Sequence, residues 1–139
     1  MVVVYSVACN VLMLRRLRPP DFWQSVTGSL TWDERLPIQA ARRELREETG
    51  LGEGLEIVDC VASGRFPILP EWRYRYGPAR ENLEHVFRVE VPEGATVELN
   101  PNEHSEYLWL PREAAAQKAN SHTNRDAILR FVPSASVHD

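Results

Sequence analysis

Apolar residues near the start of the chain come in short runs of the kind that form strands. Val2–Ala8 and Val11–Leu17 are rich in β-branched and aliphatic residues, and Cys9-Asn10 between them predicts a tight turn. Pro19-Pro20-Asp21 breaks this pattern, and a short extended segment is expected over Trp23–Leu30. The beginning of the chain is therefore predicted to consist of buried strands.

The next patterned stretch has the spacing of an amphipathic helix. Ile38, Ala41 and Leu45 recur three and four residues apart, which places one apolar stripe along a helix from about Pro37 to Thr49. A proline suits the first helical turn, and Gly50 is the expected stop.

The rest of the chain returns to strand patterns and ends in helices. Further strands are predicted over Leu55–Phe66, Trp72–Tyr76, Leu83–Val91 and Tyr107–Leu110. Pro111 with Glu113 opens a short Ala-rich helix, and Thr123 with Asp126 resembles a capping box before a closing amphipathic helix. Strands on both sides of a central helix favour an α+β fold, an α/β/α sandwich in which a mixed sheet lies between helices.

Composition and charge place these elements in an ordinary globular chain. Its 139 residues suit a single domain spanning 1–139, with 43% hydrophobic and 26% charged residues. A net charge of −4 and a pI near 5.6 give no general electrostatic support for nucleic-acid binding. An anionic ligand would have to be held locally, by a metal ion or by a few arginines.

The cysteines and the apolar start of the chain indicate the cellular compartment in which the protein is expected. Cys9 and Cys60 are the two cysteines, and they indicate neither a disulfide framework nor a zinc pair. The run Met1–Leu14 lacks a basic flank and a cleavage site, and it is too short to span a bilayer. We therefore expect a cytoplasmic protein with no membrane partner, and the sequence carries no signal for an oligomeric state.

Three glutamates gather within one stretch of the predicted helix. Glu44, Glu47 and Glu48 stand at positions i, i+3 and i+4, so their side chains project onto one face within reach of each other. Taken alone, a glutamate-rich helix face is usually solvated and paired with arginines. Alternatively such a patch holds a divalent cation, and oxygen-only ligands select a hard ion such as Mg²⁺ or Mn²⁺.

The surrounding residues favour the metal interpretation. Gly28 and Glu34 precede the string Arg43-Glu44-Leu45-Arg46-Glu47-Glu48-Thr49-Gly50-Leu51, and the whole stretch resembles the Nudix box: a glycine, a loop glutamate, then Arg-Glu-apolar-x-Glu-Glu-x-Gly-apolar. Eight residues separate Glu34 from Arg43, one more than in the family pattern. We place the extra residue near Pro37 or Ile38, which keeps the register of the helical glutamates intact and leaves the role of Glu34 open.

The resemblance implies a Mg²⁺-dependent hydrolase with the Nudix fold, with Mn²⁺ as the other candidate ion. By this resemblance Glu44 and Glu48 ligate the metal, Glu47 is a further ligand or orients water, and Arg43 holds a carboxylate in place. A bound divalent ion neutralises charge on phosphate oxygens and lowers the pKa of a coordinated water, which agrees with these roles. The expected products are a nucleoside-type monophosphate and pyrophosphate.

A wider resemblance covers nearly the whole chain. Val11–Arg16 and Asp21–Ser29 are similar to the bacterial dihydroneopterin triphosphate pyrophosphohydrolases, also called dATP pyrophosphohydrolases, and the likeness continues through Glu103-His104 and Asn124-Arg125. It implies hydrolysis of dihydroneopterin triphosphate, a small molecule, in a step toward folate. The alternative substrate is dATP or another nucleoside triphosphate, because the ring pocket sets the choice.

The same resemblance implies residues outside the box. Glu103 would be a third metal ligand from a loop, although by default it is an exposed loop acid. Arg16 and Thr27 would contact the substrate. By default Arg16 is a solvated charge and Thr27 is a strand residue. The other residues implied to line the pocket are Phe66, Pro67, Ile68, Leu69 and Ser121. Proline has no N–H, so any hydrogen bond that relatives donate from the backbone at position 67 would be lost.

Two features of the sequence suggest other classes of protein. Trp72–Tyr76 interleaves aromatic and basic residues as nucleic-acid stacking platforms do, but its period of two is explained more simply by a half-buried strand. A binding module that kept the fold without turnover is favoured only by the extra loop residue. The intact glutamates argue against such a module.

Overall fold

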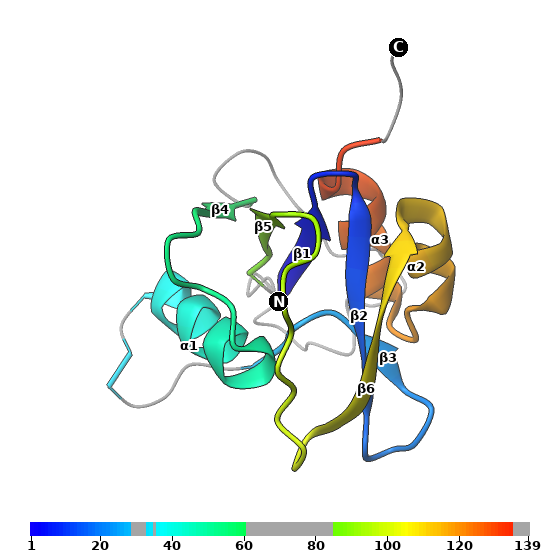
Figure 1. The fold of residues 1–139 in the computed structure, drawn as a ribbon, viewed down its shortest axis with the longest axis horizontal. Coiled ribbons are helices and arrows are strands. Elements are labelled where there is room, and N and C mark those ends of the chain that lie inside the picture. Colours follow the sequence, from blue (N-terminus) through cyan, green and yellow to red (C-terminus); the bar gives the residue numbers. More distant parts are fainter. Residues whose placement is uncertain (29–32, 35, 61–84, 135–139) are drawn as a thin grey trace, which may run out of the picture.

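Six strands of the described residues form a mixed sheet at the centre of the fold (Figure 1). The computed structural model describes residues 1–28, 33–34, 36–60 and 85–134. Strands β1 and β5 are parallel, and the other pairs are antiparallel, with β6 joining the sheet through β2. The strands, in the order β3-β2-β1-β5-β4 and then β6, are Trp23–Gln24, Asn10–Arg16, Val2–Ser6, Phe87–Val91, Ile57–Asp59 and His104–Pro111.

Helices cover both faces of this sheet. In Figure 1, α1 (Pro37–Thr49) lies on one side, and α2 (Arg112–Lys118) and α3 (His122–Phe131) lie together on the other. Val2 and Val4 of β1 belong to the hydrophobic cluster on the α1 side, whereas Val3 and Tyr5 belong to the cluster on the α2 and α3 side. Both faces of β1 are therefore buried, which explains its unbroken apolar sequence and confirms the predicted α/β/α sandwich.

The hairpin of β1 and β2 opens to admit a third segment. The two strands pair at Tyr5 and Val11, close to their turn. Farther along, β2 pairs with β3 instead, and β1 is bridged to Val26, just beyond β3. The segment 23–26 therefore inserts between the ends of the two strands and leads directly to the box glycine, Gly28.

Some element boundaries differ from those expected. The first turn occupies Val7–Cys9 rather than Cys9-Asn10, because Cys9 adopts φ 67° and donates its N–H to the carbonyl of Ser6 at 2.7 Å. Strand β6 begins earlier than expected because it pairs with β2 along its whole length. In contrast, α1 has the predicted bounds, and Gly50 follows it.

The start of α3 also differs. The expected capping box of Thr123 and Asp126 is wrong: Ser121 is the N-cap, and its hydroxyl accepts the N–H of Asn124 at 3.3 Å. The predicted strand Trp72–Tyr76 and the end of Leu55–Phe66 lie outside the described residues. No helix among the described residues is long and apolar enough to cross a membrane.

Candidate active site

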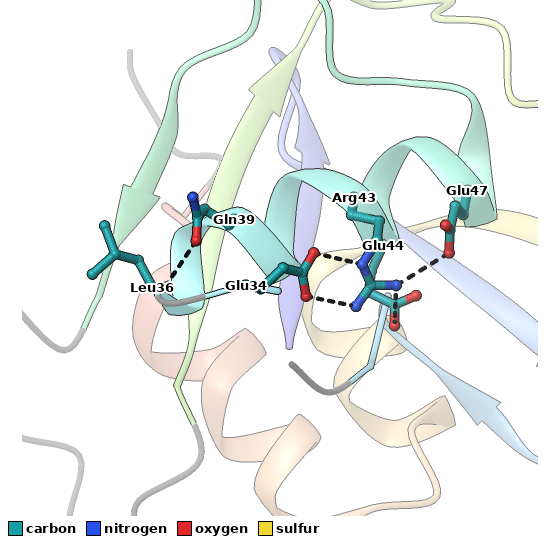
Figure 2. Close-up of polar contacts among 6 residues, drawn as sticks. All are labelled: Glu34, Leu36, Gln39, Arg43, Glu44 and Glu47. Atoms are coloured by element: carbon teal, nitrogen blue, oxygen red, sulfur yellow. Dashed lines mark hydrogen bonds and ion pairs between the residues drawn. The ribbon is translucent and has the colours of Figure 1, made fainter. Parts of the chain in front are cut away.

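The box glutamates are carried by α1, which has a defined start and end. Gln39 reaches back so that its Oε1 accepts the N–H of Leu36 at 3.0 Å (Figure 2). At the other end Gly50 adopts φ 76° and donates its N–H to the carbonyl of Arg46 at 2.9 Å. Glycine reaches this left-handed conformation without steric cost, so the helix ends at Thr49, one residue after Glu48.

Glu48 is a buried carboxyl group without a compensating charge. Only 2% of the residue is exposed, and its Oε1 accepts no hydrogen bond from any described residue. Burial raises the pKa of Glu48, and the nearby carboxylates of Glu44 and Glu103 raise it further. A carboxylate in this position is unfavourable unless a cation joins it.

The donor set at this point fits a hard divalent cation. The carboxyl groups of Glu44 and Glu48 lie close enough to influence each other, and burial raises the pKa of Glu44 as well, although Arg43 opposes that rise. In the part of the chain that the structure describes, no three His, Cys, Asp or Glu side chains lie close enough together to hold a metal ion. A cation at this point would satisfy Oε1 of Glu48, and oxygen donors favour Mg²⁺ or Mn²⁺.

Gly28 is packed directly against Glu44. A Cβ at position 28 would overlap the carboxylate of Glu44, so any other residue would displace this side chain. The neighbouring residue Thr27 makes a backbone hydrogen bond to Glu48. The box glycine therefore provides space for one glutamate, next to a backbone contact with another.

Arg43 joins the loop glutamate to the helical ones (Figure 2). Its Nε and Nη2 donate to the two carboxylate oxygens of Glu34 at 2.6 and 3.1 Å, which is a bidentate ion pair. Its Nη1 lies 3.3 Å from Glu44 and 3.2 Å from Glu47. The hydrogen bond with Glu34 is the main reason that the pKa of Arg43 is raised. Glu34 therefore reaches its partner despite the extra residue between them.

A cavity of about 290 Å³ opens beside Glu48. Its lining brings together four residues that the sequence marked, Arg16, Thr27, Glu48 and Glu103. The backbone N–H of Leu17 donates to the carbonyl of Glu103 at 3.0 Å, which ties the loop before β6 to the end of β2. The remaining lining residues are Leu17, Arg18, Gln24, Asn102 and His104. The cavity thus combines acidic groups that suit a cation with arginines that suit phosphates.

The family model described as NUDIX domain matches residues 1–131, which include every helix and strand described above. The chain belongs to the Nudix family. It is an enzyme of the pyrophosphohydrolase type, and Nudix hydrolases generally require a divalent metal ion.

Similar proteins narrow the family further. The chain is 40% identical to the dihydroneopterin triphosphate diphosphatase of Escherichia coli, over 98% of this chain and 92% of the relative. It is 38% identical to the enzyme of the same name from Haemophilus influenzae, over 95% and 85% of the two chains. The solved structure of the E. coli dihydroneopterin triphosphate pyrophosphohydrolase has a TM-score of 0.74 and 39% identity, covering 95% of this chain and 92% of that one. These likenesses confirm the resemblance seen in the sequence.

Two polar residues of this Nudix site were not singled out from the sequence. His104 is 3% exposed, and its Nε2 lies 4.0 Å from Glu48 Oε1 and 3.4 Å from Gln24 Nε2. Burial lowers the pKa of His104, which favours a neutral ring. A single histidine or glutamine without a metal-ligand spacing gives no chemical signal, so only the fold reveals that both adjoin Glu48.

Two other predicted site residues, Ser121 and Glu47, do not line this cavity. Ser121 caps α3 and is not among the lining residues, and the side chain of Glu47 is 52% exposed and paired with Arg43. Phe66, Pro67, Ile68 and Leu69 lie outside the described residues. The roles expected for these six residues stay predictions.

Proposed function

We propose that this protein hydrolyses dihydroneopterin triphosphate to dihydroneopterin monophosphate and pyrophosphate. Water forms a bond to phosphorus, the anhydride bond between the first and second phosphates breaks, and pyrophosphate leaves. Relatives of this name at 38–40% identity over nearly the full chain support the substrate. The observation that carries the chemistry is the buried carboxyl group of Glu48, whose Oε1 accepts no hydrogen bond from the described residues. It lies near Glu44 and lines a cavity that also contains Arg16.

In this proposal Glu44, Glu48 and Glu103 hold Mg²⁺, with Mn²⁺ as the other candidate. When bound, the ion supplies charge neutralisation for the phosphate oxygens and acidifies the attacking water. Arg43 keeps the carboxylate of Glu44 in place through its 3.3 Å contact, because its other nitrogens are anchored on Glu34. Glu47, at the exposed edge of the same helix, adds a ligand or orients the water.

A second group of residues is proposed to place the substrate. Arg16 has a guanidinium that suits bidentate contact with phosphate oxygens, and its position over the ring of Phe22, 5.5 Å from the centroid, restricts its orientation. Thr27 contacts the substrate from the inserted segment. The ring is proposed to bind against Phe66, Pro67, Ile68, Leu69 and Ser121, with an aromatic face available for stacking.

We further infer that the enzyme acts in the cytoplasm on a small-molecule triphosphate, without a nucleic-acid or membrane partner. Both Cys9 and Cys60 are free thiols, as expected in a reducing compartment. The net charge of −4 is unfavourable for a general phosphate-backbone contact, so the arginines of the cavity must act locally.

A competition assay tests the substrate. Dihydroneopterin triphosphate and dATP are supplied together with Mg²⁺, and the consumption of each and the release of pyrophosphate are followed. We expect kcat/KM for the pterin to exceed that for dATP by roughly tenfold or more, since the ring pocket makes the distinction. A preference for dATP would support a general nucleoside triphosphate pyrophosphohydrolase instead. No pyrophosphate from any triphosphate would contradict the proposed reaction.

A further inference from the structure

The free edge of the inserted segment meets a helical region. Alternate residues of a strand direct their N–H and C=O groups toward opposite edges. Gln24 pairs with Leu14 of β2, so the backbone groups of Trp23 and Ser25 face away from β2. On that side lie the connection between α2 and α3 and the first turn of α3.

Two asparagine side chains complete this edge. Asn120 Oδ1 accepts the N–H of Trp23 at 2.7 Å, and the N–H of Asn120 donates to the carbonyl of Trp23 at 3.1 Å. Asn124 Oδ1 accepts the N–H of Ser25 at 2.7 Å, and its Nδ2 donates to Ser25 Oγ at 2.9 Å. Asn124 is 1% exposed, so its amide has exchanged water for these bonds. Together the two asparagines take the place of a neighbouring strand.

This contact lies across the sheet from the glutamates. Trp23 belongs to the hydrophobic cluster that includes Ile128 of α3, whereas Val26 belongs to the cluster that includes Leu45 of α1. Gln24, between the two asparagine-bound residues, lines the cavity. The asparagines therefore hold the segment from one face of the sheet, and the segment presents its site residues on the other.

The segment is connected to the glutamates by direct contacts. Two residues after Ser25, the backbone of Thr27 is hydrogen-bonded to Glu48. One residue later, Gly28 leaves no room between its backbone and Glu44. A shift of the strand edge at Ser25 would therefore move or crowd both carboxylates.

We propose that Asn124, assisted by Asn120, is a positioning residue for the metal-binding glutamates. It fixes the position of the segment 23–28 relative to α1, and thereby the distance between the carboxyl groups of Glu44 and Glu48. This inference rests on the proposed function, because it assumes that these two carboxylates hold the divalent ion.

Three variants separate positioning from general stability. Asn124→Ala removes both side-chain bonds and leaves the Ser25 N–H buried and unpaired. Asn120→Ala removes the bond to Trp23 from an exposed position and is expected to fold. Arg112→Ala is the matched control, because Arg112 donates to the carbonyls of Leu129 and Val132 at 2.6 and 3.1 Å and so secures the far end of α3.

Mn²⁺ binding to the full chain, measured by titration calorimetry without substrate, is the main readout. We expect Asn124→Ala to weaken Mn²⁺ binding roughly tenfold, the usual scale for residues that orient metal ligands. Amide hydrogen exchange should become faster at Trp23 and Ser25 in the same variant. Arg112→Ala should lower the unfolding temperature and leave both the Mn²⁺ affinity and these two amides close to wild type.

Several outcomes would overturn the proposal. Equal Mn²⁺ affinities in Asn124→Ala and Arg112→Ala would make Asn124 a stabiliser of the fold alone. If Asn124→Ala does not fold, Asn120→Ala decides, and an unchanged Mn²⁺ affinity in that variant overturns the proposal. Wild-type protein that binds no Mn²⁺ would overturn the metal site of the proposed function and this inference with it, so the two failures are distinguishable.

Discussion

At the scale of single residues, the site depends on groups that are unfavourable when considered alone. Glu48 is buried with an unpaired oxygen, and its pKa is raised chiefly by that burial. His104, also buried, has an Nδ1 without a hydrogen-bond partner among the described residues. Unsatisfied buried groups are rare in stable proteins and tend to occur where a ligand completes them. The cavity beside Glu48 is the place where such a ligand would bind.

Gly28→Ala should damage the site by taking up space. The new methyl group would overlap the carboxylate of Glu44, so we expect Mg²⁺-dependent turnover to fall by more than about a hundredfold, the upper range for displaced ligand geometry. Gly54→Ala is the control: nothing lies within 4 Å of its Cβ, but its φ of 76° strains alanine. It should lower stability by roughly 1 kcal/mol and leave kcat unchanged. Similar kcat values in the two variants would refute the crowding of Glu44.

At the scale of elements, α1 and the loop before it act as one unit. Arg43 is the link, with a bidentate pair to Glu34 on one side and contacts to Glu44 and Glu47 on the other (Figure 2). The pair with Glu34 is mostly buried, the side chains being 11% and 21% exposed, so water screens it weakly. This link therefore contributes both to the stability of the helix start and to the placement of Glu44.

Glu34→Ala should reveal both contributions. Loss of a charged bidentate hydrogen bond is expected to lower the free energy of unfolding by roughly 1 to 3 kcal/mol, measured by urea titration. Arg43 would then be free to pull Glu44 toward itself, so the Mg²⁺ concentration for half-maximal activity should rise. Glu106→Ala, which breaks a surface pair with Arg15 at 3.4 Å, should cost about 0.5 kcal/mol or less. Equal losses of stability in the two variants would show that the Glu34 pair is no more than a surface contact.

Local signals made α1 predictable, and long-range pairing made other features unpredictable. Pro37 and Gly50 mark the ends of the helix within the sequence itself, and the structure confirms both. The insertion of segment 23–26 depends on β1 and β2 separating, which no local pattern encodes. Likewise the meeting of Gln24 with His104 joins residues 80 positions apart. The sequence therefore predicts the glutamate-bearing helix of the site, whereas the cavity is apparent only in the three-dimensional structure.

At the scale of the whole molecule, the helices on the two faces of the sheet have different roles. The α1 layer supplies acidic groups on one face of the sheet, and the α2 and α3 layer holds the inserted segment from the other face (Figure 1). The chain carries a net charge of −4, so a triphosphate is not attracted by the protein as a whole. In the proposed function, a cation held by the glutamates would act together with Arg16 to bind the triphosphate at one point of the surface.

The most direct test compares Mg²⁺-dependent pyrophosphate release from dihydroneopterin triphosphate by wild-type protein and by Glu48→Gln. This change removes a ligand charge and little volume, so the fold should remain, as checked by the unfolding temperature. We predict that turnover falls by roughly a thousandfold or more, because the metal contributes several kcal/mol to the reaction. Glu106→Gln, the same change at a site 47% exposed, should behave as wild type. Near-normal pyrophosphate release by Glu48→Gln would contradict the metal-binding role on which the account depends.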